Sequence, residues 1–492
     1  MLPSLLFVLP VSLHRAAAHT LGRGVTGLPR RALLVSQAGG RASAAVTQAS
    51  AEAKAKPSSM DLNPPRGTRD FYPGGEVGGM GLRSWLFEQW RTVAAQHGFE
   101  EYDAPVLETE ELYVRKAGED VTNQLYSLED RSGRRLALRP EMTPSLARMV
   151  LARRGGLPLP LKWFSIPQCW RYERTTRGRR REHFQWNLDI WGVEELTAEA
   201  ELLHAAVSFM RRVGLTSADV GIKVSTRAVL AELLSKIGLP NERFAETCVL
   251  IDKLDKLPEE EVRQALLQQG LSDDGVSTLL STLKLVDFAT LEEAMGADSP
   301  ALTDLKKVFS LADAYGLSDW LVLDISVVRG LAYYTGVVFE GFDRSGELRA
   351  IFGGGRYDKL LSTFGGDDLP AAGFGFGDAV IMELLESKKL LPDLPTSMVD
   401  AVVFAMNDEL LPQAMQLAST LRAAGRNVDM VLQPKKTKWI FKHADRLDAK
   451  FVVLLAPQEA EKGLVRVKNL GEGTQIDVEF ASIVSAVPAQ CS

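Results

Sequence analysis

Six arginines lie within eleven residues, at Arg171, Arg174, Arg177, Arg179, Arg180 and Arg181. Gly178 lies among them, and residues 161–173 and 182–193 alternate apolar and polar side chains. The sequence therefore predicts two strands joined by a basic hairpin loop. A guanidinium binds phosphate through a planar fork of donors, and a basic loop suits a nucleic-acid backbone. A solvated charged loop is the alternative interpretation.

The outgoing strand of this hairpin has one apolar face and one polar face, because side chains alternate across a strand. Its polar face carries Gln185, Asn187 and Asp189. On the incoming strand, Arg171 and Glu173 can point the same way. Such a face either borders water or forms the floor of a pocket that recognises both an anion and an amine.

A carboxylate and a hydroxyl follow one another closely in the segment LRPEMTPS at 138–145. Glu141 lies among apolar and proline neighbours, and Thr143 follows two residues later. One interpretation is a capping box before a helix that begins near residue 144. The other is a pair of groups that binds a substrate ammonium.

An arginine lies between two apolar runs in the segment VVRGLAYYTGVVF at 327–339. Burying Arg329 there is costly unless it is paired or meets an anion, so it marks a structural ion pair or an anion site. Tyr333 and Tyr334 follow it directly.

Two glycine clusters come later in the chain. Three glycines precede a predicted helix in IFGGGRYDKL at 351–360, and Gly373, Gly375 and Gly377 alternate along GFGFGD. Alternate glycines leave one face of a strand bare, so that a flat ring can lie against the backbone. We expect Asp378 to cap the helix that follows. Neither cluster matches the dinucleotide-binding fingerprint.

The elements that must position these residues follow from periodicity. Residues 81–97 and 144–153 have helical spacing, 194–320 are mostly helical, 321–364 return to strands, and 373–386 form a strand that leads into a helix. Pro392 and Pro395 indicate a linker. An α/β pattern follows it, with strands at 401–405, 427–432 and 451–455 and helices at 408–424 and 437–447.

The first 59 residues differ in composition from the rest. They contain seven basic residues, one acid and many alanines and serines. This composition is typical of an organellar transit peptide, and a secretory signal or an unprocessed tail is the alternative. The whole chain of 492 residues has a formal charge of −6, so a nucleic-acid partner must meet a local basic patch. Three scattered cysteines exclude a disulfide framework, and no later stretch of 18 apolar residues predicts a membrane span.

In combination, these segments resemble the histidyl-tRNA synthetase family of class II aminoacyl-tRNA synthetases, of the organellar or bacterial-like kind. The resemblance covers about residues 60–480. RGLAYY and GGGRYD are specific to the histidine branch and its relatives, whereas the arginine hairpin is common to class II enzymes. The segment KKTKWIFKHADRLDAKFVVLL looks like the family's anticodon-binding domain.

The resemblance implies an α/β (α+β) fold with an antiparallel sheet flanked by helices. It divides the chain into a transit peptide at 1–59, a catalytic domain at 60–225 and 321–396, a helical insertion at 226–320, and an α/β anticodon-binding domain at 397–492. The implied activity is that of a histidine–tRNA ligase, which activates L-histidine with ATP and transfers it to tRNA(His). A homodimer in the mitochondrion, the chloroplast or both is also implied.

The resemblance also assigns roles to individual residues. The histidine site comprises Glu141, Met142, Thr143, Gln185, Asp189, Tyr333, Tyr334 and Tyr357. ATP contacts come from Arg171, Glu173, Gln185, Arg329, Gly375 and Gly377. Arg171 and Arg329 are the catalytic pair, and Arg174, Arg177 and Arg179 approach the tRNA. Mg²⁺ accompanies ATP, and no resident metal site is implied. His183 is interpreted as structural, because the reaction needs no protein base.

One departure from the family pattern concerns ATP. Val380 occupies the position where the family usually has an arginine for the γ-phosphate, and Ala332 replaces a common aspartate. Two other functions therefore compete with the ligase. One is a histidine-binding regulatory module, like the regulatory subunit of ATP phosphoribosyltransferase. The other is a tRNA-binding sensor without catalysis.

Overall fold

The computed structural model describes residues 60–488, apart from 77, 116–121, 252–253, 255–256, 297, 328–332 and 395–397. The predictions for the leader, Arg329, Ala332 and Cys491 thus fall outside the described residues. None of the helices in the described part of the chain is both long enough and apolar enough to cross a membrane.

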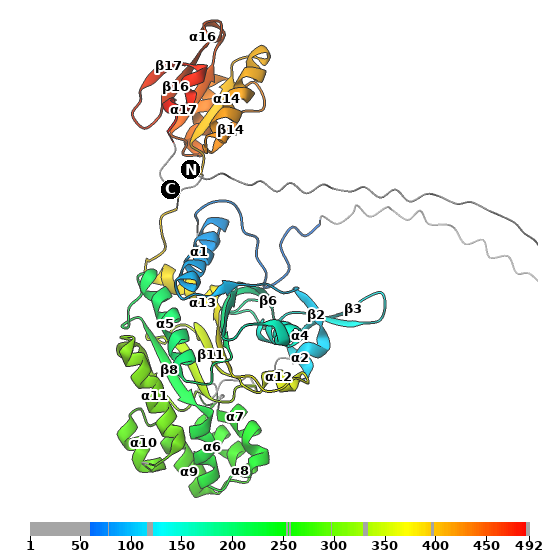
Figure 1. Ribbon diagram of the computed structural model, residues 1–492, viewed down its shortest axis with the longest axis vertical. Helices are drawn as coiled ribbons and strands as arrows, with labels where there is room; N and C mark the ends of the chain where they lie inside the picture. The colour runs from blue at the N-terminus through cyan, green and yellow to red at the C-terminus, as the bar shows by residue number, and fades with distance from the viewer. Residues whose placement is uncertain are drawn as a thin grey trace, which may run out of the picture. The chain divides into compact units, whose positions relative to one another are not determined.

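A nine-stranded sheet organises the larger part of the chain (Figure 1). Its order is β1 (Glu100–Glu101), β5 (Leu161–Ser165), β7 (Glu182–Trp191), β12 (Ala371–Gly377), β11 (Phe352–Arg356), β10 (Val337–Asp343), β8 (Val220–Thr226) and β9 (Leu321–Leu323). The ninth strand, β6 (Gln168–Trp170), pairs with β7. All pairs are antiparallel except those at the two edges, β1 with β5 and β8 with β9. The predicted antiparallel sheet is confirmed.

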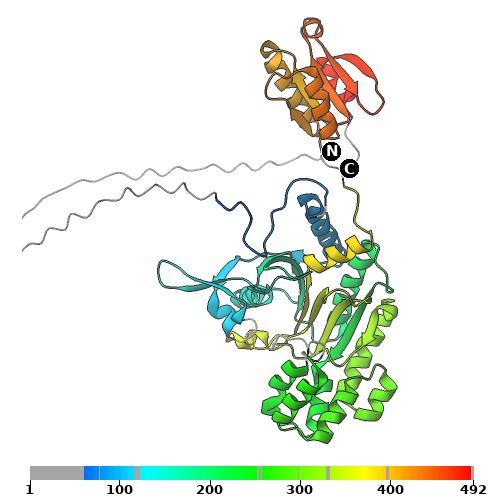
Figure 2. The same cartoon turned by 180° about the vertical axis from the view of Figure 1, so that it is seen from behind.

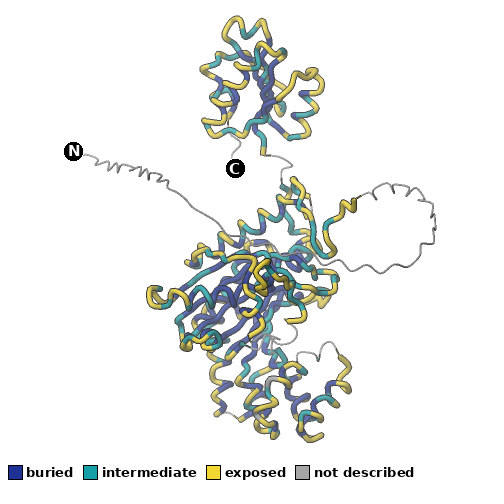
Figure 3. Tube along the Cα trace, turned by 90° about the vertical axis from the view of Figure 1, so that its right-hand side faces the viewer, coloured by how far each residue is buried: buried dark blue, intermediate teal, exposed yellow. Residues whose placement is uncertain are grey.

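Helices α1 (Met80–Gln96), α5 (Thr197–Arg212) and α13 (Asp378–Ser387) pack near one face of this sheet. The apolar face of β7 meets them, as its alternation predicted, and Trp186 stacks on Trp90 of α1 with ring centroids 6.0 Å apart. Figure 3 shows the burial concentrated in the strands and on the inner sides of the helices. This apolar layer holds the polar face of β7 turned the other way.

The opposite face of the sheet carries shorter elements, whose bounds are α2 (Glu110–Val114), α4 (Thr143–Arg153), α12 (Leu360–Thr363) and a three-stranded sheet of β2 (Leu107–Thr109), β4 (Arg135–Leu138) and β3 (Tyr126–Glu129). Leu146 of α4 shares a second apolar cluster with Trp191, Tyr334 and Tyr357. This cluster supports the polar pocket described below.

Between β8 and β9 the described residues form six α-helices, drawn in green in Figures 1 and 2: α6 (Arg227–Lys236), α7 (Phe244–Ile251), α8 (Glu259–Gln268), α9 (Asp273–Thr282), α10 (Phe288–Met295) and α11 (Pro300–Ala314). Ser272, Asp287 and Ser299 cap α9, α10 and α11 with side-chain acceptors, as expected for these residue types.

The stretch 194–320 is mostly helical, as predicted, but the prediction did not foresee β8, which interrupts it. Residues VGIKVST alternate only weakly, with six of seven buried. Such a short, buried run does not distinguish a strand from a helix by periodicity. Its main partner is β10, where Val224 pairs with Phe339. That pairing partner lies more than a hundred residues away, so local sequence carries no sign of it.

The C-terminal part has its own five-stranded sheet in the order β14 (Val428–Met430), β13 (Ala401–Ala405), β15 (Phe451–Leu455), β16 (Leu464–Asn469) and β17 (Gln475–Glu479). Its helices are α14 (Leu411–Ala423), α15 (Thr437–Arg446), α16 (Pro457–Ala460) and α17 (Ile483–Ala486). The predicted α/β pattern is confirmed, but β16 and β17 were not foreseen.

Candidate active site

The polar face of the main sheet has a floor of glycines. Gly373, Gly375 and Gly377 of β12 lie opposite Asp189, Asn187 and Gln185 of β7. On its other side β12 pairs with β11, where Gly353 and Gly355 take part in the register. Residues directly opposite in an antiparallel pair point to the same face. The sheet is therefore bare over two strands and bordered by polar side chains on the third.

The glycines are required sterically at two of these positions. A Cβ atom on Gly375 would overlap the amide of Gln185, and one on Gly373 would overlap Asp189 and the Tyr357 hydroxyl. At Gly377 no atom lies within 4 Å of the position of a Cβ, so the floor is open there. A flat ligand can approach the backbone at this open end.

Asp189 forms the acidic end of the site. It is 1% exposed, and the Tyr357 hydroxyl donates to its Oδ1. Its Oδ2 is buried and has no hydrogen-bond partner in the described part of the chain. Burial raises the pKa of Asp189 to about 7, against the hydrogen bond from Tyr357, which lowers it. A buried acceptor without a partner is costly, so this oxygen is suited to a ligand N–H group.

Glu141 provides a second buried carboxylate. The Tyr333 hydroxyl donates to its Oε2 at 2.8 Å. Burial raises the pKa of Glu141, while Arg171 and Tyr333 act in the opposite direction. The alternative capping box is not formed, since α4 begins at Thr143 with no side-chain cap. Glu141 is therefore held by a tyrosine and remains available to a ligand.

The neighbours of Glu141 in the sequence are also buried. Thr143 is 7% exposed and its side chain interacts with Tyr333. Met142 is completely buried, and its sulfur accepts a hydrogen bond from Arg139 at 3.6 Å, so its side chain has a structural role. The rings of Tyr333 and Tyr334 lie 5.0 Å apart, and Tyr333 meets Tyr357 edge-on at 5.8 Å. The sequence-predicted tyrosines thus converge on the two carboxylates.

Arg171 marks the other, cationic end of the site. Its Nε donates to the Pro140 carbonyl at 3.0 Å, which fixes the side chain next to Glu141. Nearby, Glu173 pairs with Arg179. Burial and the charge of Arg171 lower the pKa of His183 to about 3, so this imidazole is neutral and its positive form is disfavoured.

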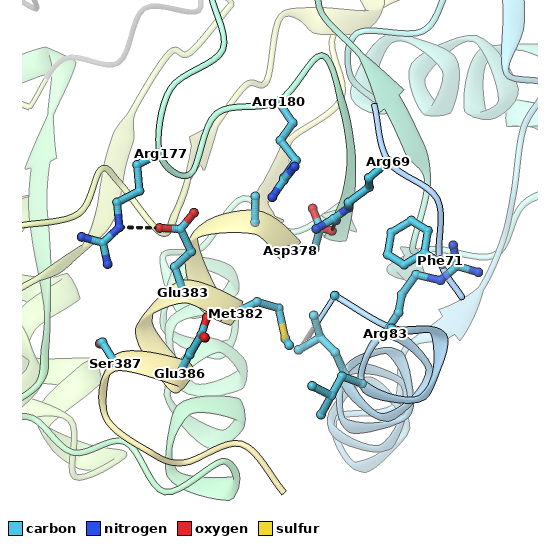
Figure 4. Close-up of a pocket in the computed structure, with 15 residues that line it drawn as sticks. Arg69, Phe71, Arg83, Arg177, Arg180, Asp378, Met382, Glu383, Glu386 and Ser387 are labelled. Atoms are coloured by element: carbon cyan, nitrogen blue, oxygen red, sulfur yellow. Dashed lines mark hydrogen bonds and ion pairs between the residues drawn. The ribbon is translucent and has the colours of Figure 1, made fainter. Parts of the chain in front are cut away.

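The basic hairpin between β6 and β7 rests on α13, as Figure 4 shows. Gly178 has a φ of +67°, the left-handed conformation that favours glycine in such a turn. Glu383 of α13 accepts hydrogen bonds from Arg177 at 2.7 Å and from the Gly178 amide at 2.9 Å. Arg174 is exposed. The hairpin is therefore anchored by its tip, with Arg174 left to solvent.

A cavity of about 400 Å³ lies between α1, α13 and this hairpin (Figure 4). It contains none of the predicted histidine-site residues. At its edge, Arg69 pairs with Asp378, and Asp378 also accepts a hydrogen bond from the Phe184 amide at 3.0 Å. The expected N-cap was wrong, since Gly377 is the N-cap and Asp378 is the first helical residue. Asp378 instead ties the N-terminal segment to β7.

Sequence reasoning missed Glu383, Arg69 and the role of Asp378, whose contacts join residues about 200 to 300 positions apart. The charged residues of the segments RDF (69–71) and MELLES (382–387) are evident in the sequence, but their partners are defined only by the fold. The site combines an arginine and a glycine-lined floor with an acidic pocket, an arrangement that fits the class II aminoacyl-tRNA synthetases.

Comparisons with known proteins identify the branch of this class. A family model described as histidyl-tRNA synthetase matches residues 80–378, and one described as an anticodon binding domain matches 400–490. The chain is 51% identical over 456 residues to a chloroplastic/mitochondrial histidine–tRNA ligase of Arabidopsis thaliana, covering 93% of both chains. It is 39% identical to a histidine–tRNA ligase of Opitutus terrae, covering 86% of this chain and 97% of the relative. The chain belongs to the histidyl-tRNA synthetase family.

Solved structures agree on the fold. The histidyl-tRNA synthetase of Nostoc sp. PCC 7120 superposes with a TM-score of 0.69 at 24% identity, covering 87% of this chain and 99% of the other. A Bacillus halodurans protein, titled an ATP phosphoribosyltransferase regulatory subunit/histidyl-tRNA synthetase, superposes with a TM-score of 0.65 and covers 78% of this chain. The fold is therefore common to both kinds of protein, and only the residues of the site can distinguish a synthetase from a regulatory subunit.

Proposed function

We propose that this protein is a histidine–tRNA ligase that activates L-histidine with ATP and then transfers it to tRNA(His). The observation that carries the proposal is the buried Oδ2 of Asp189, which has no partner among the described residues. The Tyr357 hydroxyl holds the other oxygen of the same carboxylate. An imidazole N–H would satisfy Oδ2, and Gln185 and the paired tyrosines would enclose the ring.

Glu141 and Thr143 would hold the ammonium group of histidine. Burial raises the pKa of Glu141, and an ammonium ion would stabilise its charged form. Met142 would support them by packing. The amino acid would then present its carboxylate toward Arg171, which lies beside Glu141.

In the first step, a histidine carboxylate oxygen would attack the α-phosphorus of ATP. A new P–O bond forms, the bond to the β-phosphate oxygen breaks, and pyrophosphate leaves with the electron pair. Arg171, together with Arg329 as the family resemblance implies, would stabilise the charge that develops on the α-phosphate. Gln185, Glu173, Gly375 and Gly377 would position the nucleotide, with the adenine ring on the glycine floor.

In the second step, the terminal ribose hydroxyl of the tRNA would attack the adenylate carbonyl and release AMP. Neither step needs a protein nucleophile, so catalysis rests on positioning and charge stabilisation. The anchored hairpin would place Arg174, Arg177 and Arg179 at the acceptor end of the tRNA. A neutral His183 fits a positioning role.

The C-terminal part offers a surface for the rest of the tRNA. Trp439 of α15 is 41% exposed and stacks on His443 with ring centroids 4.7 Å apart. His443 is held by Asp429 at 2.7 Å, and Lys435 lies over the Trp439 ring. An aromatic ring flanked by lysines suits an unpaired base and its phosphate. We assign residues 397–492 to anticodon binding, after a catalytic domain at 60–225 and 321–396 that the helical insertion 226–320 interrupts.

Mg²⁺ would enter with the nucleotide. The described residues hold no cluster of three or more metal-binding side chains, whereas a magnesium ion in a nucleotide site usually needs one or two carboxylates plus phosphate oxygens. The ion would neutralise phosphate charge. We also propose a homodimer, and import into the mitochondrion, the chloroplast or both through residues 1–59, which the name of the Arabidopsis relative supports.

The test is transfer of labelled histidine to a tRNA(His) transcript by the purified full-length chain with ATP and Mg²⁺. We expect acid-precipitable label that depends on ATP and is absent with a tRNA(Phe) transcript. A folded protein that binds histidine but neither charges tRNA nor forms adenylate would instead favour the regulatory module, for which Val380 and the Bacillus likeness are the supporting observations. Binding of tRNA without adenylate would favour the sensor.

A further inference from the structure

Val380 cannot bind phosphate, and the structure shows what it does instead. It is 7% exposed and packs beneath the hairpin, such that a Cβ on Gly178 would lie 3.2 Å from its Cγ2. Glu383, about one turn further along α13, holds the same hairpin tip (Figure 4). The first turn of α13 therefore serves as a support for the hairpin and offers no cation at this position.

A cation reaches the same region from a different strand. The Gly377 amide, at the N-cap of α13, donates to the Ile351 carbonyl at 3.3 Å. Phe352 and Phe376 are paired next to this bond. The segment before β11 thus runs beside the start of α13, and Arg349 lies two residues upstream of Ile351.

The charges of Arg171 and Glu340 both act on the side chain of Arg349. Loss of surrounding water, and then the positive charge of Arg171, lower its pKa, whereas Glu340 raises it. Glu340 lies opposite Gly353 in the register of β10 and β11, and therefore on the glycine face. Arg179 is affected in the same way, since burial, Arg349 and Arg171 each lower its pKa.

Three guanidinium groups thus act on one another electrostatically, near where the hairpin, α13 and the β10–β11 loop come together. Glu173 pairs with Arg179, and Glu340 raises the pKa of Arg349 through its charge. Like charges gathered at one place repel one another, and a polyanion offsets that repulsion. A nucleoside triphosphate carries the negative charge that such a group of cations would bind.

We propose that Arg349, with Arg179 before the tRNA arrives, binds the β- and γ-phosphates of ATP, in place of the arginine that the family resemblance implies at the position of Val380. This inference rests on the proposed function. During adenylation, Arg171 would remain with the α-phosphate. Arg349 would stabilise the negative charge that the departing pyrophosphate takes with the electron pair of the broken P–O bond.

The test compares Arg349→Gln with a matched control, Arg344→Gln, in the full-length protein. Arg344 lies in the same loop, but its guanidinium contacts the Asp319 carbonyl at 3.0 Å and the Phe342 ring. Binding of ATP, pyrophosphate and AMP is measured by calorimetry with Mg²⁺. Loss of a charged hydrogen bond predicts weaker binding of ATP and pyrophosphate by about 10–100-fold in Arg349→Gln. AMP binding should change less than about twofold.

The remaining variants separate binding from structure. Arg349→Lys should recover part of the loss, because lysine keeps the charge but not the planar fork. Equal weakening of ATP and AMP would overturn the inference, since it would mean a distorted pocket. So would unchanged ATP binding, or an equal effect of Arg344→Gln. If Arg349→Gln weakens binding of ATP and pyrophosphate selectively, but the wild-type protein charges no tRNA, the proposed function fails while this phosphate site stands.

Discussion

The two ends of the candidate site are built on opposite principles. The end that we propose for histidine, called the histidine end below, consists of two buried carboxylates, each held by one tyrosine hydroxyl, and burial raises both pKa values. The phosphate end consists of arginines on a hairpin and a loop that keep contact with solvent. Under this proposal, a small amino acid is recognised by a few polar groups that are buried and held in place. A triphosphate, a leaving pyrophosphate and a tRNA end must enter and depart, which suits an open, cationic region.

The largest effect is expected at the junction of the two ends. Arg171→Gln should lower kcat/KM for histidine-dependent ATP–pyrophosphate exchange by about 10²–10³-fold, because a preorganised charge at the α-phosphate is lost. Its melting temperature should change little, since the side chain makes one hydrogen bond to the Pro140 carbonyl. Exchange near the wild-type rate would contradict the assignment. Arg329→Ala is expected to have a similar effect on exchange.

The buried end should reveal itself in the pH dependence of stability. The pKa of Asp189 is raised to about 7 by burial, whereas an unfolded aspartate titrates near 4. Between these values the folded state binds more protons than the unfolded state, so stability falls as pH rises. Relative to wild type, Asp189→Asn should gain roughly 2–4 kcal/mol between pH 4 and pH 8 in urea unfolding.

The control for this experiment is Asp367→Asn, because the side chain of Asp367 is 97% exposed. Its stability should follow that of the wild-type protein across the same pH range. A constant difference between Asp189→Asn and wild type would show that Asp189 does not titrate in this window.

The same substitution should affect the ligand selectively. Asp189→Asn replaces a charged acceptor with an amide, and we expect the KM for histidine to rise about 10–100-fold. The KM for ATP should stay within about twofold, since the phosphate end is untouched. Equal changes in both constants would mean that the two ends are not separable.

The glycine floor between the two ends can be probed by adding one methyl group. Gly377→Ala has open space and an ordinary φ of −81°, so the protein should fold normally. We expect the KM for ATP to rise about 5–20-fold, because the methyl group occupies part of the nucleotide floor. Gly375→Ala should in addition lower the melting temperature, as its Cβ would overlap Gln185. No effect of Gly377→Ala on ATP would place the nucleotide elsewhere.

The smallest effect is expected at the solvent side of the hairpin. Arg174→Gln should raise the KM for tRNA about 2–5-fold, since one exposed phosphate contact is modest and is screened by salt. The exchange reaction, which needs no tRNA, should be unchanged. A loss of exchange in this variant would place Arg174 in the nucleotide site.

Much of this site could be predicted from sequence because its residues follow local patterns. Alternation in one strand separated Trp186 from Gln185 and Asp189, and the glycine spacing of β12 predicted a bare floor. The identity of the partners could not be predicted. Tyr333 reaches Glu141 across 192 positions, and Arg69 reaches Asp378 across 309. Such pairings depend on strand order, which local periodicity does not contain.

The errors have the same origin. Strand β8 was assigned to a helical stretch because its partner β10 lies far along the chain, and Asp378 was assigned as a helix cap because its true partner lies near the N-terminus. Arg349 is one arginine in a polar loop, and its local sequence predicts no role for it. It gains meaning only from the hairpin and the helix that the fold brings beside it.

The most direct test of the account is ATP–pyrophosphate exchange by the wild-type protein with each of the twenty amino acids in turn. The account predicts exchange with histidine and background rates with the other nineteen, because an imidazole N–H beside the tyrosines would satisfy the unpartnered Oδ2 of Asp189. Exchange supported by several amino acids, or by none in a protein that binds histidine, would contradict it.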